Sequence, residues 1–309
     1  MRHLRVIVAG GSGFIGNAVV NHLSERENEV IVLTRRPRVR VDGIREVAWD
    51  GKSLGNWEQF VDGADVVINL AGKNINCVFN AANRRLIVES RVNSVRAIAE
   101  AVRKAARPPR VWIQASAIGY YGETWAAADE STANGNGFLA ETCRAWEEAM
   151  QPDSVPAVRC VTLRFGVVLG RNGGALKPLL RLTRCFFGGA AGNGRQYISW
   201  VHLSDLVQVT TQAMEHESWR GVFNVTSPHP VTNAQFMREL RLLLDRPWSP
   251  PAPAWAVRLF APLMATDPSL ALESQRVLPR RLLVSGFQFG FPELRSALLD
   301  ILSPPREPC

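Results

Sequence analysis

The residues that most clearly predict chemistry are three glycines near the start of the chain, Gly10, Gly13 and Gly16, spaced as G-x-x-G-x-x-G. An apolar run typical of a buried strand precedes them at 6–9, and a segment with helical spacing of apolar residues follows. In this context the glycines permit a tight turn, the close approach of a pyrophosphate and close packing of the helix on the sheet. The alternative is a glycine-rich loop without a ligand. We predict a dinucleotide site formed by Gly10, Ser12, Gly13, Phe14, Ile15 and Gly16.

The next informative residues lie roughly 20 positions after the glycines, where an NAD-preferring site carries Asp or Glu. This chain has Thr34, Arg35 and Arg36 there. A carboxylate would repel a 2′-phosphate, whereas a guanidinium binds one through charge-assisted, often bidentate hydrogen bonds. The three residues therefore predict NADP(H) rather than NAD(H). A solvated basic loop is the alternative, because charge runs are often simply exposed.

Two further strand ends carry small residues that would admit a ligand. One apolar run ends in Leu70, Ala71 and Gly72, and another leads into the turn 116–122, SAIGYYG. Open parallel sheets bind their ligands at the carboxyl ends of strands. We therefore expect Leu70, Ala71 and Gly72 to contact the cofactor, and the turn to face the same site.

The elements that must position these residues alternate along the chain. This alternation predicts an α/β fold with a Rossmann-type, doubly wound, mostly parallel sheet. The expected strands are 6–9, 29–33, 41–49, 65–70, 110–115, 158–165, 198–201 and 221–225, and the expected helices follow Gly16 or occupy 83–106, 138–150 and the segments that begin at Ser204 and Thr232.

After Gly170 the pattern changes, because glycines interrupt the segment up to Tyr197. This texture predicts the loops of a second lobe. We divide the chain into a dinucleotide-binding domain at 1–170 with a return strand near 221–226, interleaved substrate-lobe segments at 171–248, and a C-terminal extension at 249–309.

Composition narrows the possible partners. The chain of 309 residues has a formal net charge of +8, but its basic residues are scattered, so we expect no nucleic-acid partner. No apolar run approaches the roughly 20 residues that cross a bilayer, and the first strand leaves no room for a signal peptide. The five cysteines are an odd number without a C-x-x-C pair, which predicts reduced thiols in the cytoplasm and no metal site: Cys77, Cys143, Cys160, Cys185 and Cys309.

With these motifs in view, the chain resembles the extended short-chain dehydrogenase/reductases, and among them the atypical branch of epimerase-family proteins. The resemblance implies a sheet of about seven strands, a C-terminal lobe over the nicotinamide end of the cofactor, and a short C-terminal extension. The matching segments occur in order along the chain: 10–16 (GGSGFIG), 67–72 (VINLAG), 89–91 (ESR), 116–122 (SAIGYYG), 138–147 (FLAETCRAWE), 163–176 (LRFGVVLGRNGGAL), 194–206 (GRQYISWVHLSDL) and 276–294 (RVLPRRLLVSGFQFGFPEL).

The same resemblance shows a departure in the acid–base residues. Ordinary members use Ser or Thr, together with Tyr-x-x-x-Lys on the next helix. Aligned on Gly122 and Glu147, these positions hold Ala117, Leu139 and Cys143 in this chain. Leucine moves no proton, so any proton transfer needs other groups, and we expect Ser116 and Tyr121 to supply it.

Four more side chains are candidates for the site. Arg91 stands where the family carries an asparagine, and we expect it to contact the cofactor. Trp200 and His202 are expected on the lobe side, against substrate, although His202 could equally be a structural histidine. We interpret Arg164 as structural, paired with an acidic residue.

The leading interpretation is an NADP(H)-binding, epimerase-like oxidoreductase that acts on a small molecule of unknown identity, in the cytoplasm and as a homodimer. The rival is a catalytically silent NADP(H)-binding regulatory or scaffold protein with a role such as cell division. RNA binding is a weaker third interpretation. The residues predict the cofactor more clearly than the reaction.

Overall fold

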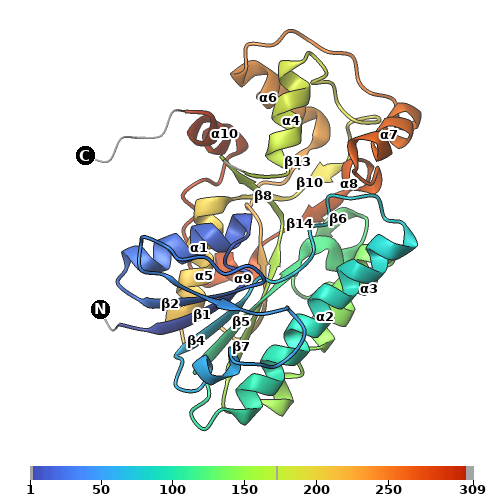
Figure 1. Cartoon of the computed structure of the whole chain (residues 1–309). Helices are drawn as coiled ribbons and strands as arrows, with labels where there is room; N and C mark the ends of the chain where they lie inside the picture. The colour runs from blue at the N-terminus through green and yellow to red at the C-terminus, as the bar shows by residue number, and fades with distance from the viewer. Residues whose placement is uncertain (1–2, 172, 304–309) are drawn as a thin grey trace.

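The computed structural model describes residues 3–171 and 173–303, and a seven-stranded sheet lies at its centre (Figure 1). The strand order is β12-β7-β5-β4-β1-β2-β3, and every neighbouring pair is parallel. The predicted Rossmann-type, doubly wound α/β fold is therefore confirmed. The strands span β1 (Arg5–Ala9), β2 (Glu29–Thr34), β3 (Arg45–Ala48), β4 (Val66–Asn69), β5 (Val111–Ala117), β7 (Arg159–Phe165) and β12 (Gly221–Val225).

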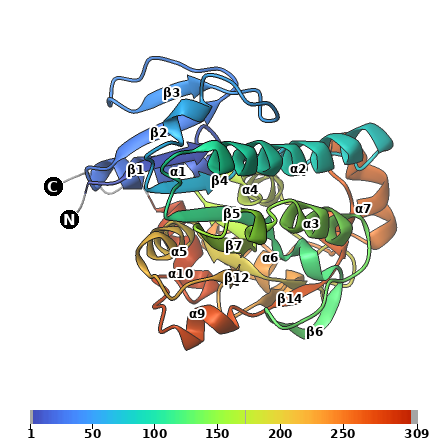
Figure 2. The same ribbon diagram turned by 90° about the horizontal axis from the view of Figure 1, so that it is seen from below.

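Four long helices cover the sheet. Helices α1 (Phe14–Glu25) and α5 (Leu203–Glu215) pack together on one face, and α2 (Ala81–Lys104) and α3 (Phe138–Glu148) on the other (Figure 2). Covering both faces explains why the strand sequences are continuous apolar runs rather than alternating ones. The side chains of β1 from Val6 to Ala9 are fully buried.

The chain order reverses between β1 and β4, which are neighbours at the centre of the sheet. Ala9 pairs with Asn69, so the two strands end level with each other. The chain then leaves β1 at Gly10 and β4 at Leu70. In open sheets of this type the crevice at such a reversal is where ligands bind.

A smaller lobe stands over the carboxyl ends of the central strands (Figure 1). It has its own core, which includes Leu176, Trp200, Phe236 and Leu294. Its elements and the remaining short ones are η1 (Glu58–Phe60), η2 (Ile118–Tyr121), β6 (Thr124–Ala128), η3 (Pro152–Ser154), β8 (Val167–Gly170), β9 (Gly173–Gly174), α4 (Leu176–Arg184), β10 (Tyr197–Ile198), β11 (Trp200–His202), β13 (Val231–Thr232), α6 (Asn233–Leu243), α7 (Ala254–Phe260), η4 (Pro262–Met264), α8 (Ser269–Leu272), β14 (Gln275–Val277), α9 (Arg280–Val284) and α10 (Leu294–Leu302).

The expectation of loops up to Tyr197 was wrong for α4, which is a helix within that segment. Its apolar residues lie toward α6 and the lobe core, and this tertiary packing outweighs the glycines on either side. The expected strand at 41–49 is also shorter than predicted, because pairing with β2 begins only at Arg45.

No helix in the described part of the chain is long and apolar enough to cross a membrane. The described cysteines are all free thiols, while Cys309 lies outside the described residues. Within 3–171 and 173–303 no cluster of His, Cys, Asp and Glu is arranged to hold a metal ion.

Candidate functional site

The glycine loop meets the backbone of the neighbouring strand end directly. Gly10 has a φ of +77°, and a Cβ atom there would lie 2.9 Å from the backbone of Leu70 and Ala71. A Cβ on Gly16 would collide with the carbonyl oxygen of Gly10. Both positions therefore require glycine for conformation or close approach.

Gly13 has a different environment, because it is exposed at the start of α1. The only atom near a Cβ built on Gly13 is the Gly10 carbonyl oxygen, at 3.3 Å, so the rest of that space is open. The first N–H groups of α1 have no carbonyl partner within the helix, and its first turn contains no acidic residue. This open, donor-lined cradle fits the phosphates of a dinucleotide.

The basic residues after β2 are available to an anion. Arg35 and Arg36 are exposed, and neither forms an ion pair within the described residues. Arg40, in contrast, is paired with Asp42 and Glu46. Thr34 lies 3.3 Å from Ser12 through their hydroxyl oxygens, which ties the end of β2 to the glycine loop.

The side chain of Phe14 connects the loop to the small lobe. Cβ atoms built on Gly170, Gly173 and Gly174 would lie within 3 Å of the Phe14 ring. These three glycines belong to β8 and β9, so the ring sits in a space that only glycines leave free. Two of the glycines that we interpreted as loop breaks, Gly173 and Gly174, therefore help to form the space that holds the Phe14 ring.

The two expected proton-transfer residues, Ser116 and Tyr121, belong to a buried hydrogen-bond network. Ser116 donates to Glu147 (2.6 Å), and the Tyr121 hydroxyl donates to Asn224 (2.8 Å). Arg164 joins the two halves, with hydrogen bonds to both oxygens of Glu147 (2.8 and 2.7 Å) and to the Tyr121 hydroxyl (2.8 Å). Burial raises the pKa of Tyr121. The network holds the ends of β5, β7 and β12 together.

The positions that carry Tyr and Lys in ordinary relatives are occupied by packed side chains here. A Cβ built on Gly119 would lie 3.3 Å from the Cβ of Leu139 and 3.6 Å from the sulfur of Cys143. Burial raises the pKa of Cys143 to about 12, so its thiol stays protonated at neutral pH. Ala117 ends β5 nearby and brings no polar atom. This wall therefore offers no acid or base.

Arg91 lies at the expected strand end, beneath the backbone that follows Gly72. Its Nη1 donates to the carbonyl oxygens of Lys73 (3.0 Å) and Ile87 (3.1 Å). Leu70, Ala71 and Gly72 form the adjoining segment, which is partly exposed at the crevice beside the glycine loop. The sequence placed these residues together, and the structure brings them to the same edge.

Trp200 and His202 are buried within the fold. Trp200 is fully buried in the core of the small lobe, where its indole N–H donates to the carbonyl oxygen of His229 (3.2 Å). His202 caps α5, accepting from the Ser204 N–H, and its ring stacks on Phe291 with 4.0 Å between centroids. Burial lowers the pKa of His202. Neither side chain lines either of the two cavities described below.

A cavity of about 540 Å³ opens beside Leu139. Segments far apart in the chain form it, since the start of α2, the turn after η2 and the region of α8 all contribute. Its wall carries one cation, Arg84, and three carboxyl groups, of Glu123, Asp267 and Glu273. Burial and the neighbouring carboxylates raise the pKa of Glu273. Sequence reasoning missed this cavity because no local motif joins the segments.

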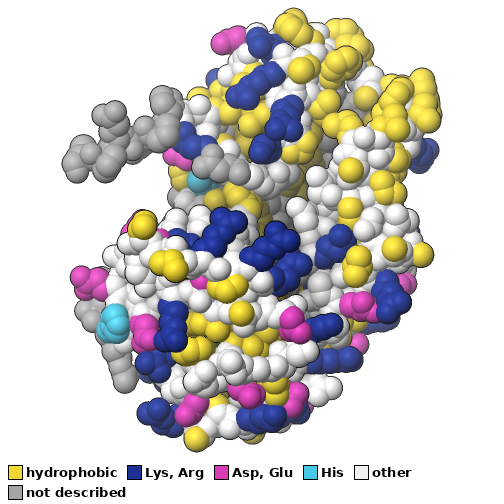
Figure 3. Space-filling view, in the orientation of Figure 1, with side chains coloured by type: hydrophobic (Ala, Val, Ile, Leu, Met, Phe, Trp, Pro, Cys, Tyr) yellow, Lys and Arg dark blue, Asp and Glu magenta, His cyan; other side chains and the backbone are white. Residues whose placement is uncertain are grey.

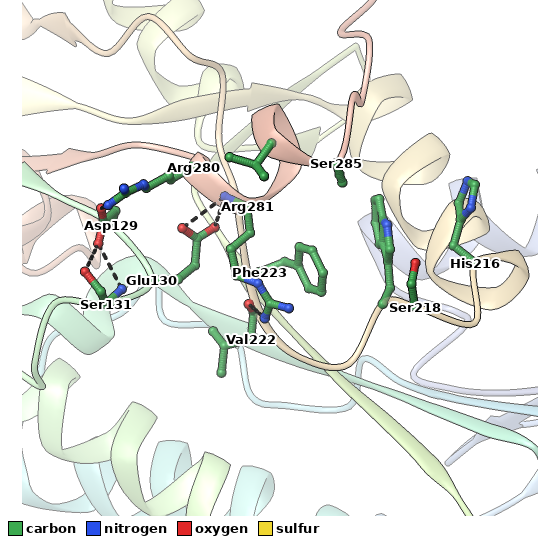
Figure 4. A pocket seen from close by; sticks show the side chains of 12 residues that line it. Asp129, Glu130, Ser131, His216, Ser218, Val222, Phe223, Arg280, Arg281 and Ser285 are labelled. Atoms are coloured by element: carbon green, nitrogen blue, oxygen red, sulfur yellow. Dashed lines mark hydrogen bonds and ion pairs between the residues drawn. The ribbon is translucent and has the colours of Figure 1, made fainter.

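A larger cavity of about 740 Å³ lies away from the crevice, along the edge strand β12 (Figure 4). Its charged groups already have partners within the chain. Arg280 pairs with Asp129 at 3.1 Å, while Glu130 accepts from the backbone N–H of Arg281 and of Asn224. The Arg281 guanidinium bonds carbonyl groups beside β12 and lies over the Phe223 ring. These contacts cover the sheet edge, and we assign the cavity no ligand.

The surface between the body and the small lobe is hollowed, and Lys and Arg side chains line its lower rim (Figure 3). This hollow lies over the carboxyl ends of the central strands, where the glycine loop and the segment after β4 meet. Anionic ligands would be attracted to such a rim.

Comparison with protein families gives two matches along the chain. The NAD dependent epimerase/dehydratase family matches residues 6–226, and a domain of unknown function, DUF1731, matches residues 252–301. The mouse epimerase family protein SDR39U1 is 37% identical over 306 residues, which cover 97% of this chain and all of the relative.

Solved structures agree with these matches. The crystal structure of human epimerase family protein SDR39U1 (isoform 2) with NADPH is 34% identical, has a TM-score of 0.84, and is aligned over 96% of this chain and 99% of its own. A nucleoside-diphosphate sugar epimerase from Corynebacterium glutamicum is 31% identical with a TM-score of 0.79, aligned over 97% of this chain and 58% of its own.

Proposed function

The chain belongs to the NAD dependent epimerase/dehydratase family, and from that premise we propose that it is an NADP(H)-binding oxidoreductase of a small molecule. The observation that carries the proposal is the open, donor-lined cradle at Gly13, together with Arg35 and Arg36, which have no ion pair among residues 3–171 and 173–303. The relative solved with NADPH supports the choice of cofactor. We place the protein in the cytoplasm, which its free thiols support.

Each part of the binding site has a distinct task. The loop from Gly10 to Gly16 and the start of α1 bind the pyrophosphate. Arg35 and Arg36 bind the 2′-phosphate, and Thr34 fixes the end of β2 against Ser12. Leu70 to Gly72 line the crevice that leads toward Leu139. When bound, the nicotinamide supplies or accepts the hydride.

The substrate in this proposal occupies the cavity beside Leu139. One arginine faces three carboxyl groups in its wall, and that arginine already donates its Nε–H to the carbonyl oxygen of Phe79 (2.8 Å). A nucleoside diphosphate would meet net repulsion there. We therefore propose an uncharged aldehyde, ketone or quinone rather than a sugar nucleotide.

A second candidate function is a catalytically silent NADP(H)-binding regulator. It is favoured by one observation, that the hydroxyl groups of Ser116 and Tyr121 both donate their protons within the network, although Tyr121 also lines the cavity beside Leu139. A protein that uses these hydroxyl groups to stabilise its fold has no free acid or base at the usual place. Cofactor binding is common to both candidates.

The preference between NADPH and NADH tests the cofactor binding that both candidate functions share. We expect NADPH to bind at least about tenfold more tightly than NADH by calorimetry, because one charge-assisted hydrogen bond contributes roughly 1.5–3 kcal/mol. The variant Arg35→Ala removes most of this preference. The matched control, Arg38→Ala, changes an exposed arginine of the same loop and leaves the preference intact. Equal affinities for the two cofactors in the unsubstituted protein would refute the assignment.

Turnover then separates the two candidates. NADPH consumption is measured against a panel of aldehydes, ketones and quinones, and the conversion of UDP-galactose, the anionic comparison, is followed separately by chromatography in the presence of NADP+, because its epimerisation consumes no NADPH. Turnover of an uncharged compound and none of UDP-galactose supports the enzyme. Tight NADPH binding without turnover of any compound supports the regulator.

A further inference from the structure

Arg91 is a largely enclosed but partly exposed arginine without a carboxylate partner among the described residues. Two of its five N–H groups, both on Nη1, donate to the carbonyl oxygens of Lys73 and Ile87. Its guanidinium carbon lies 4.9 Å from the centroid of the Trp146 ring. Burial lowers its pKa. An arginine this enclosed normally pairs with an acid, because an unpaired buried cation is costly.

The remaining donors of Arg91 are not sealed inside the protein. Nε and Nη2 form no hydrogen bond to the described residues, and neither is among the fully enclosed polar atoms that lack a partner. They are therefore accessible to an incoming hydrogen-bond acceptor. The carbonyl bonds of Nη1 fix the guanidinium plane, so these donors are held in position before a ligand arrives.

The position of Arg91 in the fold indicates which part of a dinucleotide would reach it. A Cβ built on Gly72 would lie 3.4 Å from the Cγ and Cζ atoms of Arg91, so glycine leaves the backbone directly over the guanidinium. Gly72 follows β4, on the opposite side of the chain reversal from β2 and Arg35. A dinucleotide lies across this reversal. If Arg35 binds the 2′-phosphate of the adenosine half, Arg91 faces the nicotinamide half.

The residue at position 143 bears on the role of Arg91. Cys143 occupies the position where the resemblance places a lysine that holds the ribose next to the nicotinamide. Its helix, α3, packs on α2, and Trp146 of the same helix lies against Arg91.

Two guanidinium groups lie near Cys143, but that of Arg164 is bonded to Glu147 and Tyr121. Among the described residues at this place, the cation with donors left over is therefore Arg91 of α2 rather than a residue of α3. We infer that Arg91 holds the hydroxyl groups of the nicotinamide ribose, taking over from the lysine that Cys143 replaces. The inference rests on the proposed function and deepens it.

The test compares two ligands that share the adenosine half. NADPH contains the nicotinamide ribose, whereas adenosine 2′,5′-bisphosphate lacks it. By calorimetry, we expect Arg91→Met to weaken NADPH binding about tenfold and to leave the bisphosphate within twofold, because a charge-assisted hydrogen bond is lost only with NADPH. The control Arg96→Met changes an exposed arginine of the same helix and affects neither ligand.

A second experiment moves the cation from position 91 to position 143, so that the test does not depend only on a loss of affinity. Arg91→Asn should weaken NADPH binding, and the combined variant Arg91→Asn, Cys143→Lys should recover at least half of the lost affinity on a logarithmic scale. Thermal unfolding without ligand checks that each variant is folded. Failure to recover in a folded double variant would overturn the replacement of lysine by Arg91.

The outcomes separate this inference from the proposed function. Unchanged NADPH affinity in Arg91→Met, or equal weakening of both ligands, overturns the inference alone. If the unsubstituted protein binds neither ligand, the proposed function fails, and the inference for Arg91 fails with it.

Discussion

Two regions at the carboxyl edge of the sheet use their polar groups in opposite ways. At the ends of β1 and β2 the donors are left open, since Arg35 and Arg36 have no ion pair in the described structure and the start of α1 presents free N–H groups. At β5, β7 and β12 the polar groups are satisfied by one another, through Ser116, Glu147, Arg164, Tyr121 and Asn224.

The difference teaches how binding and catalysis can be separated within one fold. A binding region must keep unpaired donors and accept their cost to stability, whereas a satisfied buried network stabilises and orders the strands it joins. In this chain the hydroxyl groups of Ser116 and Tyr121 donate hydrogen bonds to other side chains of the network, and Tyr121 also lines the cavity beside Leu139. We call the glycine loop with Arg35 and Arg36 the open region, and the network of Ser116, Glu147, Arg164, Tyr121 and Asn224 the closed region. Substitutions in the open region should affect ligand affinity, and substitutions in the closed region should affect the free energy of unfolding.

The largest expected effect is on the closed region. Arg164→Met removes the cation of a largely buried ion pair and leaves the Glu147 carboxylate without its partner. We expect the free energy of unfolding to fall by about 3 kcal/mol. Urea unfolding measures this loss. The control is Arg110→Met, whose ion pair with Asp65 is more exposed and should cost about 0.5 kcal/mol. A loss in Arg164→Met no larger than the control would contradict the stabilising role of the network.

The next effect is on the open region. Gly13→Val places a branched side chain in the phosphate cradle, and we expect NADPH affinity to fall at least 100-fold, about 2.7 kcal/mol. Thermal unfolding should change little, because the space around Gly13 is otherwise empty. Gly55→Val, in an exposed loop with one distant neighbour, is the control. Normal NADPH binding by a folded Gly13→Val would place the cofactor elsewhere.

A smaller effect sharpens the comparison at Tyr121. Tyr121→Phe removes the hydroxyl that donates to Asn224 and accepts from Arg164, and we expect a loss of about 1–2 kcal/mol in unfolding free energy. NADPH affinity should remain within twofold. Tyr197→Phe, whose hydroxyl has no hydrogen bond in the described structure, is the control. If Tyr121→Phe leaves stability unchanged but abolishes turnover, the hydroxyl belongs to the reaction instead.

The smallest perturbation is chemical labelling of the cysteines. Because burial raises the pKa of Cys143 to about 12, almost no thiolate exists at pH 8. We expect iodoacetamide to modify the exposed Cys185 and to spare Cys143 in the folded protein, as measured by mass spectrometry. Rapid modification of Cys143 at pH 8 would show that this wall is open to solvent.

The sequence predicted the open region well because its chemistry is local. Strand, glycine turn and helix occupy one short stretch, and the residues that follow β2 lie where the turn places them. The same local signals placed the seven strands and four long helices close to their observed bounds. Thr232, expected to begin a helix, is the N-cap of α6 and forms a capping box with Gln235.

The closed region was less predictable because its partners are distant in the chain. Ser116 and Tyr121 carry hydroxyl groups at a strand end, which is as typical of catalysis as of structure. Only the fold brings Glu147 and Asn224 to them. The cavity beside Leu139 was missed for the same reason. Helix α4 was missed because its packing against the rest of the lobe cannot be predicted from a segment interrupted by glycines.

The seat of Phe14 has a consequence for protein engineering. Its ring fills the space left by Gly170, Gly173 and Gly174. The glycine loop and the β8–β9 hairpin, which are far apart in the chain, therefore have complementary shapes. A loop transplanted from another dinucleotide-binding protein would bring a ring of the wrong size, or none, and leave a void or a clash. Chimeras that exchange the loop must therefore exchange the hairpin with it.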